Sequence, residues 1–390
     1  MTARFNTRTG RTLVLTVGLS LAAVGCSSSS SSSAAPGAAS STTGSATDTT
    51  TTATTSMAAT DTASSGGTSG NLSAETDTPL KGDCTAAKLG YPAIADFKGV
   101  KVGFSQSEPD NASFRAAETK SIKDEAAKQG ATLLYADANS KADQQISDIK
   151  DLVNQGVQLL IVAPLNSDGL QPAWDAAAAK KIPVVTIDRL VNQTQCKDYI
   201  TFIGSNFVEQ GKRAADAMAK ALNNKGNVVI LLGSSGNGVT TDRTKGFVDE
   251  MAAVAPGVKI SKQTTGNFDR TTGQTVAANM LQADPTITGI YAENDEMGVG
   301  AWQAAKAAGK TTGPGKAIQI VSIDGIADAV SKVADGTYTA VIQSNPRFGP
   351  LAFAALKAFE GTDGVPAKII IKDRDYLDAA SAKANLSFAF

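Results

Sequence analysis

Residues 100–136 are VKVGFSQSEPDNASFRAAETKSIKDEAAKQGATLLYA, and this stretch predicts the fold. It opens on a short apolar run, continues through a helix expected from about Asn111 to Gln129, stops at Gly130 and closes on a second apolar run. Strand, helix and strand in this order form a βαβ unit with parallel strands and a right-handed crossover.

The same alternation runs through two halves of the chain. Further strands are expected at TLLYA, VQLLIVA and PVVTI in the first half, and at NVVILL, VKISKQ, ITGIYA and AIQIVSI in the second. Helices are expected at about 142–154, 169–179, 242–253, 270–281 and 298–307. The length of 390 residues suits about two domains, so we predict two doubly wound, Rossmann-like α/β lobes.

Polar side chains directly follow the expected strands. Ser105 follows VKVGF, Asp188 and Arg189 follow IPVVTI, Asn294 follows GIYAE, and Asp324 follows IQIVSI. Ligands of open α/β sheets bind outside the carboxyl ends of the strands, so these groups should surround one cleft. Such a cleft suits a small, hydroxyl-rich molecule.

Composition excludes several function classes. A formal net charge of −1 argues against a nucleic-acid partner, since such proteins usually carry a basic patch. The chain has no histidine, which removes Ser-His-Asp and Cys-His catalysis and the commonest ligand of zinc and copper. We expect no cofactor and no metal.

The first residues predict export and lipid anchoring. Arg4, Arg8 and Arg11 precede an apolar run at 13–24, and LAAVGC at 21–26 resembles a bacterial lipobox. Residues 1–26 would then be a lipoprotein signal peptide with its lipidation site, Cys26, anchoring the protein to the outer face of the cytoplasmic membrane. The alternative is a simple signal peptide with a chance cysteine. Residues 27–80 are mostly Ser, Thr, Ala, Gly and Asp, which predicts a disordered linker.

Two cysteines remain, Cys84 and Cys196. An exported protein lies in an oxidising compartment, which favours a disulfide between them. Two buried thiols are the alternative.

Six motifs in one order carry a family resemblance. They are Ser105 with FRAAET at 114–119, IDR at 187–189, DRTKGF at 242–247, NDEM at 294–297, SIDG at 322–325 and QSNP at 343–346. From about Val100 to Ala380 the chain thus resembles the type I periplasmic sugar-binding proteins of the ribose and galactose group. Within that group it is most similar to the galactofuranose-binding proteins of ABC importers.

The resemblance implies two lobes joined by three crossing segments, near 203–206, 324–343 and 373–376. One lobe would comprise 98–204 and 344–373, and the other 205–343 and 374–390. It also implies hydrogen bonds to sugar hydroxyls from Ser105, Arg115, Asp188, Arg189, Arg243, Asn294, Asp324 and Gln343, with Phe114 and Phe268 covering the ring face.

The chemistry of the residues supports a sugar site independently. Sugar hydroxyls both donate and accept, so a closed site needs accepting carboxylates and donating guanidinium groups that neutralise one another. Asp188 beside Arg189, and Asp242 beside Arg243, offer both.

Each of these residues has a simpler interpretation. Asp242 could cap its helix, Asp324 with Gly325 could form an ordinary turn, and Phe114 and Phe268 could be core aromatics. Glu108, Glu118, Asp137 and Asp295 are expected near the cleft, as supports of the site or as solvated side chains.

The function expected is that of a monomeric substrate-binding lipoprotein, which captures a monosaccharide and delivers it to an ABC permease and its ATPase. A sugar-sensing subunit of a receptor is the alternative, because it would share all the ligand residues. A sugar-active enzyme is less favoured. Carboxylates next to arginines have a lowered pKa, which suits binding better than proton transfer.

Overall fold

The computed structural model describes residues 76–111 and 113–390. The predicted signal peptide, Cys26 and most of the predicted linker lie outside the described residues. At the predicted end of the linker, the Thr76 hydroxyl donates to the Ile370 carbonyl at 2.5 Å. The backbone of Thr76 also forms a bridge to Ile371. Packing therefore extends a few residues before the boundary that composition suggests.

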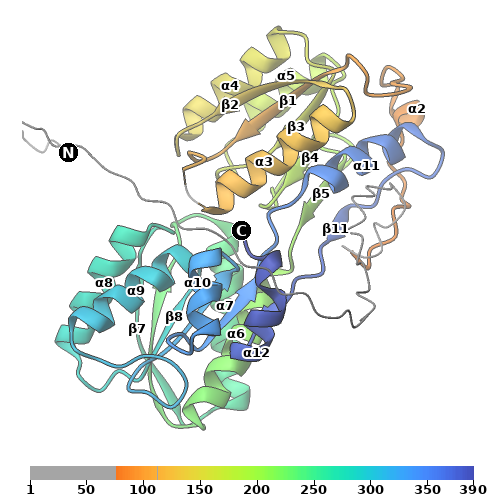
Figure 1. The fold of residues 1–390 in the computed structure, drawn as a ribbon. Coiled ribbons are helices and arrows are strands. Elements are labelled where there is room, and N and C mark those ends of the chain that lie inside the picture. The colour runs from red at the N-terminus through yellow and green to blue at the C-terminus, as the bar shows by residue number, and fades with distance from the viewer. Residues whose placement is uncertain (1–75, 112) are drawn as a thin grey trace, which may run out of the picture. The chain divides into compact units, whose positions relative to one another are not determined.

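Two six-stranded sheets organise the described residues (Figure 1). The first, in the order β11-β5-β4-β3-β1-β2, is parallel throughout. Its strands are β1 (Lys101–Gln106), β2 (Thr132–Asp137), β3 (Leu159–Val162), β4 (Val184–Ile187), β5 (Thr201–Gly204) and β11 (Lys368–Ile370). The second, in the order β12-β10-β9-β8-β6-β7, is parallel except for β12. Its strands are β6 (Gly226–Leu232), β7 (Val258–Thr265), β8 (Gly289–Ala292), β9 (Gln319–Asp324), β10 (Ala340–Gln343) and β12 (Asp375–Tyr376).

We call the first sheet with its helices the N-lobe and the second sheet with its helices the C-lobe. The N-lobe helices are α2 (Ala86–Leu89), α3 (Ser113–Lys128), α4 (Ala142–Asn154), α5 (Gln171–Ala179) and α11 (Gly349–Glu360). The C-lobe helices are α6 (Phe207–Leu222), α7 (Gly238–Val254), α8 (Arg270–Ala283), α9 (Asp295–Ala307), α10 (Ala327–Ala334), α12 (Ala379–Asn385) and the 3₁₀ turn η1 (Leu386–Phe388).

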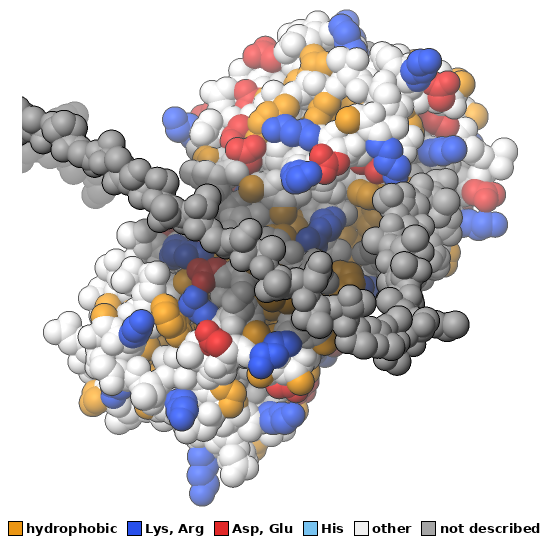
Figure 2. All heavy atoms as spheres, in the orientation of Figure 1, with side chains coloured by type: hydrophobic (Ala, Val, Ile, Leu, Met, Phe, Trp, Pro, Cys, Tyr) orange, Lys and Arg blue, Asp and Glu red, His pale blue; other side chains and the backbone are white. Residues whose placement is uncertain are grey.

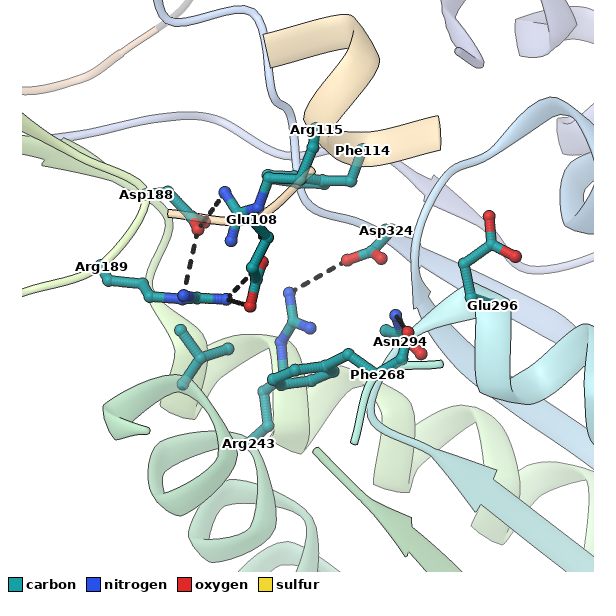
Figure 3. A pocket seen from close by; sticks show the side chains of 11 residues that line it. Glu108, Phe114, Arg115, Asp188, Arg189, Arg243, Phe268, Asn294, Glu296 and Asp324 are labelled. Atoms are coloured by element: carbon teal, nitrogen blue, oxygen red, sulfur yellow. Dashed lines mark hydrogen bonds and ion pairs between the residues drawn. The ribbon is translucent and has the colours of Figure 1, made fainter. Parts of the chain in front are cut away.

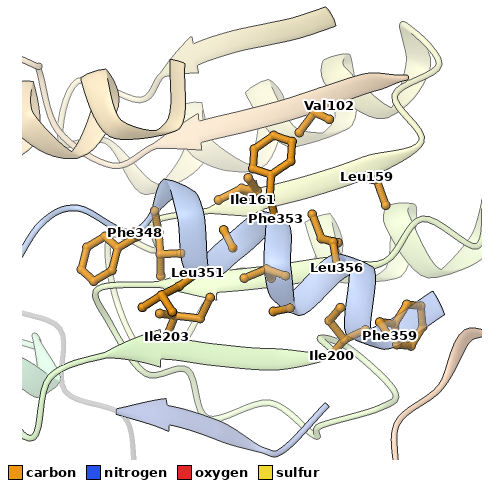
Figure 4. Close-up of a cluster of buried hydrophobic side chains, with 14 of the residues drawn as sticks. Val102, Leu159, Ile161, Ile200, Ile203, Phe348, Leu351, Phe353, Leu356 and Phe359 are labelled. Atoms are coloured by element: carbon orange, nitrogen blue, oxygen red, sulfur yellow. The ribbon is translucent and has the colours of Figure 1, made fainter. Parts of the chain in front are cut away.

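Both faces of each sheet are covered, which explains the continuous apolar runs. In β3, Leu159 and Ile161 pack with side chains of α3 and α11, while Leu160 and Val162 pack with α4 and α5. Figure 4 shows the first of these cores, with Phe353 of α11 against the sheet. Successive side chains of a strand point to opposite faces, so a strand between two helix layers must be apolar throughout.

The C-lobe is built in the same way. Alternate residues of β6 and β8 pack against α6 and α7 on one face and against α8 and α9 on the other. The two lobes therefore place the carboxyl ends of similar parallel strands at a common site.

Two helices begin earlier than the sequence patterns predict. Helix α7 begins at Gly238, not near Asp242, and α9 begins at Asp295, not Gly298. The side chain of Asn237 accepts from the Val239 N–H, and that of Asn294 accepts from the Met297 N–H. Asparagine is among the strongest N-cap residues, so each helix begins right after its asparagine.

The chain passes between the sheets three times, after β5, after β10 and between β11 and β12. We call these the first, second and third crossing segments. The second follows Gln343, which places it beyond the stretch 324–343 that the resemblance implied, since β9 and β10 are neighbouring strands of one sheet. Cys84 and Cys196 form a disulfide in the N-lobe. None of the helices within 76–111 and 113–390 has the length and apolarity needed to cross a membrane.

Candidate functional site

A cavity of about 70 Å³ lies between the lobes. Its lining is charged apart from two phenylalanines, a valine and an asparagine (Figure 3). The lining residues are Glu108, Phe114, Arg115, Asp188 and Arg189 of the N-lobe, and Val239, Arg243, Phe268, Asn294, Glu296 and Asp324 of the C-lobe. One water needs about 10–15 Å³ on this scale, so the space suits one compact ligand.

In the N-lobe half, two buried arginines share three carboxylates. Arg115 contacts Glu108 at 2.7 Å, Glu118 at 2.7 Å and Asp188 at 2.8 Å. Arg189 contacts the Glu108 carboxylate at 2.8 Å, and its Nη1 donates to the Leu165 carbonyl at 3.1 Å. Each guanidinium is thus held by several partners and presents a fixed array of donors.

One donor of this half remains available. The buried Arg189 Nε has no hydrogen-bond acceptor among the described residues, and the Asp188 carboxylate lies 3.6 Å from it. A buried donor without an acceptor is costly, so a ligand oxygen placed here would be stabilising.

The pKa values of two carboxylates in this half, Glu108 and Glu118, shift in opposite directions. Burial alone would raise the pKa of Glu108, but Arg189 and Arg115 together lower it to about 2. Burial raises the pKa of Glu118 to about 7, despite the opposing charge of Arg115. Glu108 is therefore an ionised acceptor at neutral pH, whereas Glu118 lies beneath it as a buried support.

In the C-lobe half, Arg243 has fewer charged partners. Its Nη2 lies 3.3 Å from the Asp324 carboxylate, and its Nη1 donates to the Glu293 carbonyl at 2.5 Å. Burial raises the pKa of Asp324 well above its usual range, with Arg243 opposing the shift. A carboxyl held in this way gains from any ligand donor that helps to stabilise its charge.

Two further buried acids support this half. Asp295 accepts the backbone N–H groups of Gly325 at 2.7 Å and Ile326 at 2.9 Å, so it holds the turn that carries Asp324. Burial raises its pKa to about 6. Glu293 accepts the Gly233 N–H at 2.7 Å, and burial raises its pKa to about 7.

The two strand-end aspartates share an uncommon backbone conformation. Asp188 follows β4 with φ 63°, and Asp324 ends β9 with φ 142°. Positive φ costs a non-glycine residue energy, and such residues concentrate at functional sites. In both lobes the turn directs a carboxylate into the cavity.

Phe114 and Phe268 face the cavity from opposite sides (Figure 3). Both contribute to the lining, so the interpretation as plain core aromatics accounts for only part of their environment. The ring of Phe114 also meets that of Phe390 edge to face, with centroids 5.9 Å apart. Two apolar rings that bracket polar walls suit a flat ligand with polar edges.

A direct hydrogen bond joins the lobes beside Phe114. The Ser113 hydroxyl, at the start of α3, donates to Glu296 of α9 at 3.1 Å. Glu296 also contacts Arg270 at 2.6 Å. The cavity is thereby bounded on one side by a contact between the lobes.

Three residues predicted at the site do not line the cavity. Ser105 lies inside β1, which continues to Gln106, and its hydroxyl contacts Gln145 at 3.4 Å. Asp242 is half-buried on α7 near Lys368, because neighbouring helix positions point in different directions and Arg243 is the one that faces the cavity. It does not cap α7 either, since the helix begins before it. Gln343 accepts from the Arg374 N–H of the third crossing segment and donates to the Tyr376 hydroxyl of β12.

Three lining residues were not among the predicted ligand contacts. Glu108 lies in the loop after β1, and a longer estimate of that strand would have placed it at the strand end. Val239 lies four residues before Arg243, on the same face of α7. Glu296 is in the first turn of α9, where no pattern distinguishes it from a helix-stabilising acid.

Charges of both signs are interspersed over the face shown in Figure 2. Within residues 76–111 and 113–390, no group of three or more acidic, cysteine or histidine side chains is arranged to hold a metal ion. The cavity lining itself consists of charged groups, one amide and apolar side chains that include two aromatic rings.

Comparisons with known proteins agree with this architecture. The chain is 36% identical over 291 residues to the galactofuranose-binding protein YtfQ of Escherichia coli strain K12, which covers 74% of this chain and 90% of that protein. A Mycobacterium smegmatis protein solved in complex with β-D-fucofuranose superposes with a TM-score of 0.70 at 34% identity, over 74% of this chain and 94% of that one. The periplasmic binding protein of the Shewanella sp. ANA-3 arabinose ABC transporter, bound to α- and β-L-arabinofuranose, gives 0.70 at 32%, over 74% and 95%.

The pattern of the periplasmic binding protein domain matches residues 102–362, a span that runs from β1 to α11 and includes every lining residue of the cavity. With two parallel sheets, three crossings and a charged cavity between the lobes, the chain belongs to the periplasmic binding protein family.

Proposed function

We propose that this protein is an extracytoplasmic substrate-binding lipoprotein of an ABC importer that captures a neutral monosaccharide between its lobes. The observation that carries the proposal is the cavity, in which arginines and carboxylates neutralise one another between two phenylalanine rings. The lining has four carboxylates against three arginines, so it offers no surplus positive charge to a sugar phosphate or acid and favours an uncharged ligand with many hydroxyls.

Relatives support a furanose or a similarly compact ring. The ligands named for the three proteins compared above are galactofuranose, fucofuranose and arabinofuranose. The small cavity favours a single ring over an oligosaccharide. We propose a galactofuranose-like sugar, or another pentose or hexose, as the cargo, with Arg189 Nε and the Asp324 carboxyl among its contacts.

Delivery follows from hinged closure. We propose lobes of 98–204 with 344–373 and of 205–343 with 374–390, which close on the sugar and present the closed form to a permease and its ATPase. The protein would act as a monomer and without catalysis.

Thermal unfolding of the full chain with D-galactose, L-arabinose, D-fucose, D-ribose and xylitol tests the capture step, followed by calorimetry. A ligand at a hundred times its Kd should stabilise the protein by about 2.7 kcal/mol. Arg189→Ala should abolish the effect, whereas the exposed control Lys245→Ala should keep it. Stabilisation by none of the neutral sugars, or turnover of one, would contradict the proposal.

Anchoring is a separate proposal, which rests on LAAVGC at 21–26. In a bacterial host, the wild type should fractionate with membranes and incorporate radiolabelled palmitate. Cys26→Ala should do neither. Equal membrane association of the two proteins would exclude a lipid anchor at this cysteine.

A further inference from the structure

One buried amide connects the cavity with the crossing segments. Gln210, on α6, has no exposed surface, and both ends of its side chain are bonded. Its Oε1 accepts from Arg243 Nε at 3.0 Å. Its Nε2 donates to Asp373 Oδ2 at 2.8 Å and to the Gln343 carbonyl at 3.2 Å. The amide thus contacts a cavity arginine at one end. At the other end it contacts the third crossing segment and the last residue of β10, where the second crossing segment begins.

Close helix packing brings these groups together. At Gly211 of α6, a Cβ would lie 2.3 Å from the Arg243 carbonyl oxygen. At Gly246 of α7, a Cβ would lie 2.1 Å from the Val208 carbonyl oxygen. Only glycines permit this approach, which sets Gln210 directly beside the stem of Arg243.

At the far end, one carboxylate joins two crossing segments. Asp373 lies in the third crossing segment, and its Oδ1 accepts from the Asn345 N–H of the second at 3.0 Å. Its other oxygen accepts from Gln210. A rotation of the lobes changes the backbone of these segments, and therefore the position of the carboxylate to which Gln210 is bonded.

We propose that Gln210 is a positioning residue that couples Arg243 in the cavity to the hinge carboxylate Asp373. An uncharged amide suits the place because Arg243 Nε needs an acceptor while Asp373 needs a donor, and one amide supplies both. The consequence for sugar binding rests on the function proposed above. The coupling itself concerns only the protein and can be measured without a ligand.

Hydrogen exchange of the full chain, followed by mass spectrometry, tests the coupling through a reciprocal effect. Arg243→Met should raise exchange of segments 343–348 and 371–376 about tenfold, although the guanidinium bonds of Arg243 are to Gln210, Glu293 and Asp324, outside both segments. Gln210→Met should do the same. In the double variant, the exchange of these segments should stay within about twofold of that in Gln210→Met alone.

Arg243 could also act on the second crossing segment by a route that does not include Gln210, and that route predicts a different result. The Asp324 carbonyl accepts from the Ser344 N–H at 2.9 Å, so Arg243 could influence the second crossing segment through Asp324 instead. If the effects of Arg243→Met and Gln210→Met simply multiply, or if Arg243→Met leaves the segments unchanged, the proposal is wrong.

A matched control separates coupling from loss of stability. Gln319 is also buried and bonded at both ends of its amide, to Lys316 and Thr339, at the end of β9 remote from Asp324. Gln319→Met should lower the denaturant midpoint while leaving exchange of 343–348 and 371–376 unchanged. Equal exchange of these two segments in the Gln319 and Gln210 variants would mean that Gln210 only stabilises the fold and does not couple Arg243 to Asp373.

A double variant that exchanges donor and acceptor in the bond between residues 210 and 373 tests whether protection from exchange can be recovered. In Gln210→Glu the donor to Asp373 is lost and two carboxylates meet, so exchange of the crossing segments should rise. Adding Asp373→Asn restores a donor facing an acceptor and should recover at least half of the protection. Calorimetry with D-galactose should then show about tenfold weaker binding for Gln210→Met than for wild type. Failure of wild type to bind any sugar counts against the proposed function alone, because the exchange experiment decides the coupling.

Discussion

The two halves of the cavity wall differ in how their arginines are held. In the N-lobe half, Arg115 and Arg189 are held by three carboxylates at 2.7–2.8 Å. In the C-lobe half, Arg243 has one carboxylate, Asp324, at 3.3 Å, and otherwise neutral acceptors. The N-lobe half is therefore organised by its own charges, whereas the C-lobe half leaves a carboxyl whose charge is poorly compensated. A ligand hydroxyl has most to add on the C-lobe side.

The largest difference between the halves should appear in stability. Arg115→Met leaves three carboxylates, two of them buried, with less positive charge and should lower the free energy of unfolding by about 3–5 kcal/mol. Arg243→Met leaves one, whose pKa is already raised, and should cost about 1–3 kcal/mol. Urea unfolding at pH 7 measures both. Equal losses of unfolding free energy in the two variants would mean that the two halves do not differ in how they stabilise the fold.

Ligand binding should depend on the C-lobe half even where folding depends on it little. Asp324→Asn removes the charge that a sugar hydroxyl would stabilise, and we expect binding weaker by about 10- to 100-fold, since a hydrogen bond to a charged group contributes about 1.5–3 kcal/mol. Folding should lose little, because burial already disfavours that charge. Calorimetry with the best sugar from the panel provides the measurement. Undiminished affinity would place the ligand elsewhere in the cavity.

The pH dependence of the unfolding free energy tests a buried acid of the C-lobe half, Glu293. The pKa of Glu293 is about 7 in the folded protein against an ordinary 4.5, so the fold binds the proton more tightly than the unfolded chain does. Its contribution is therefore fully present below about pH 4.5 and is lost as the pH rises through 7. Glu293→Gln should reduce the slope of unfolding free energy against pH in this window by up to about 1 kcal/mol per pH unit.

Denaturation curves from pH 4.5 to 8 for wild type and Glu293→Gln provide the test. Asp249→Asn, an exposed acid with 58% of its side chain accessible, serves as the control and should leave the slope unchanged. Identical slopes in wild type and Glu293→Gln would mean that Glu293 titrates normally.

The smallest effect is expected at Asp242. It stands next to Arg243 in the sequence but does not line the cavity. Asp242→Ala should change sugar affinity by less than about twofold and stability by about 0.5 kcal/mol or less. A loss comparable with that of Asp324→Asn would show that α7 turns when the sugar binds.

Sequence patterns predict the lobes better than the connections between them. Most of the strands that were expected are buried apolar runs, although β2 and β7 at the sheet edges are only partly buried. Strands β5, β10, β11 and β12, which flank the three crossing segments, were not predicted. The ends of the strands are harder to predict than their positions, because apolar periodicity does not distinguish Phe104 from Gln106 as the last paired residue of β1. That difference moves Ser105 out of the cavity lining and brings Glu108 into it.

By itself, the sequence determined the α/β class, the polar strand ends and the aspartates and arginines that follow them, because these depend on residues close together in the chain. Only the tertiary structure decided which side chains meet. Gln210, Arg243 and Asp373 come together because α6 and α7 cross at two glycines and the chain passes between the sheets three times. Contacts between residues so far apart depend on helix rotation and strand register, and no local pattern encodes either of them.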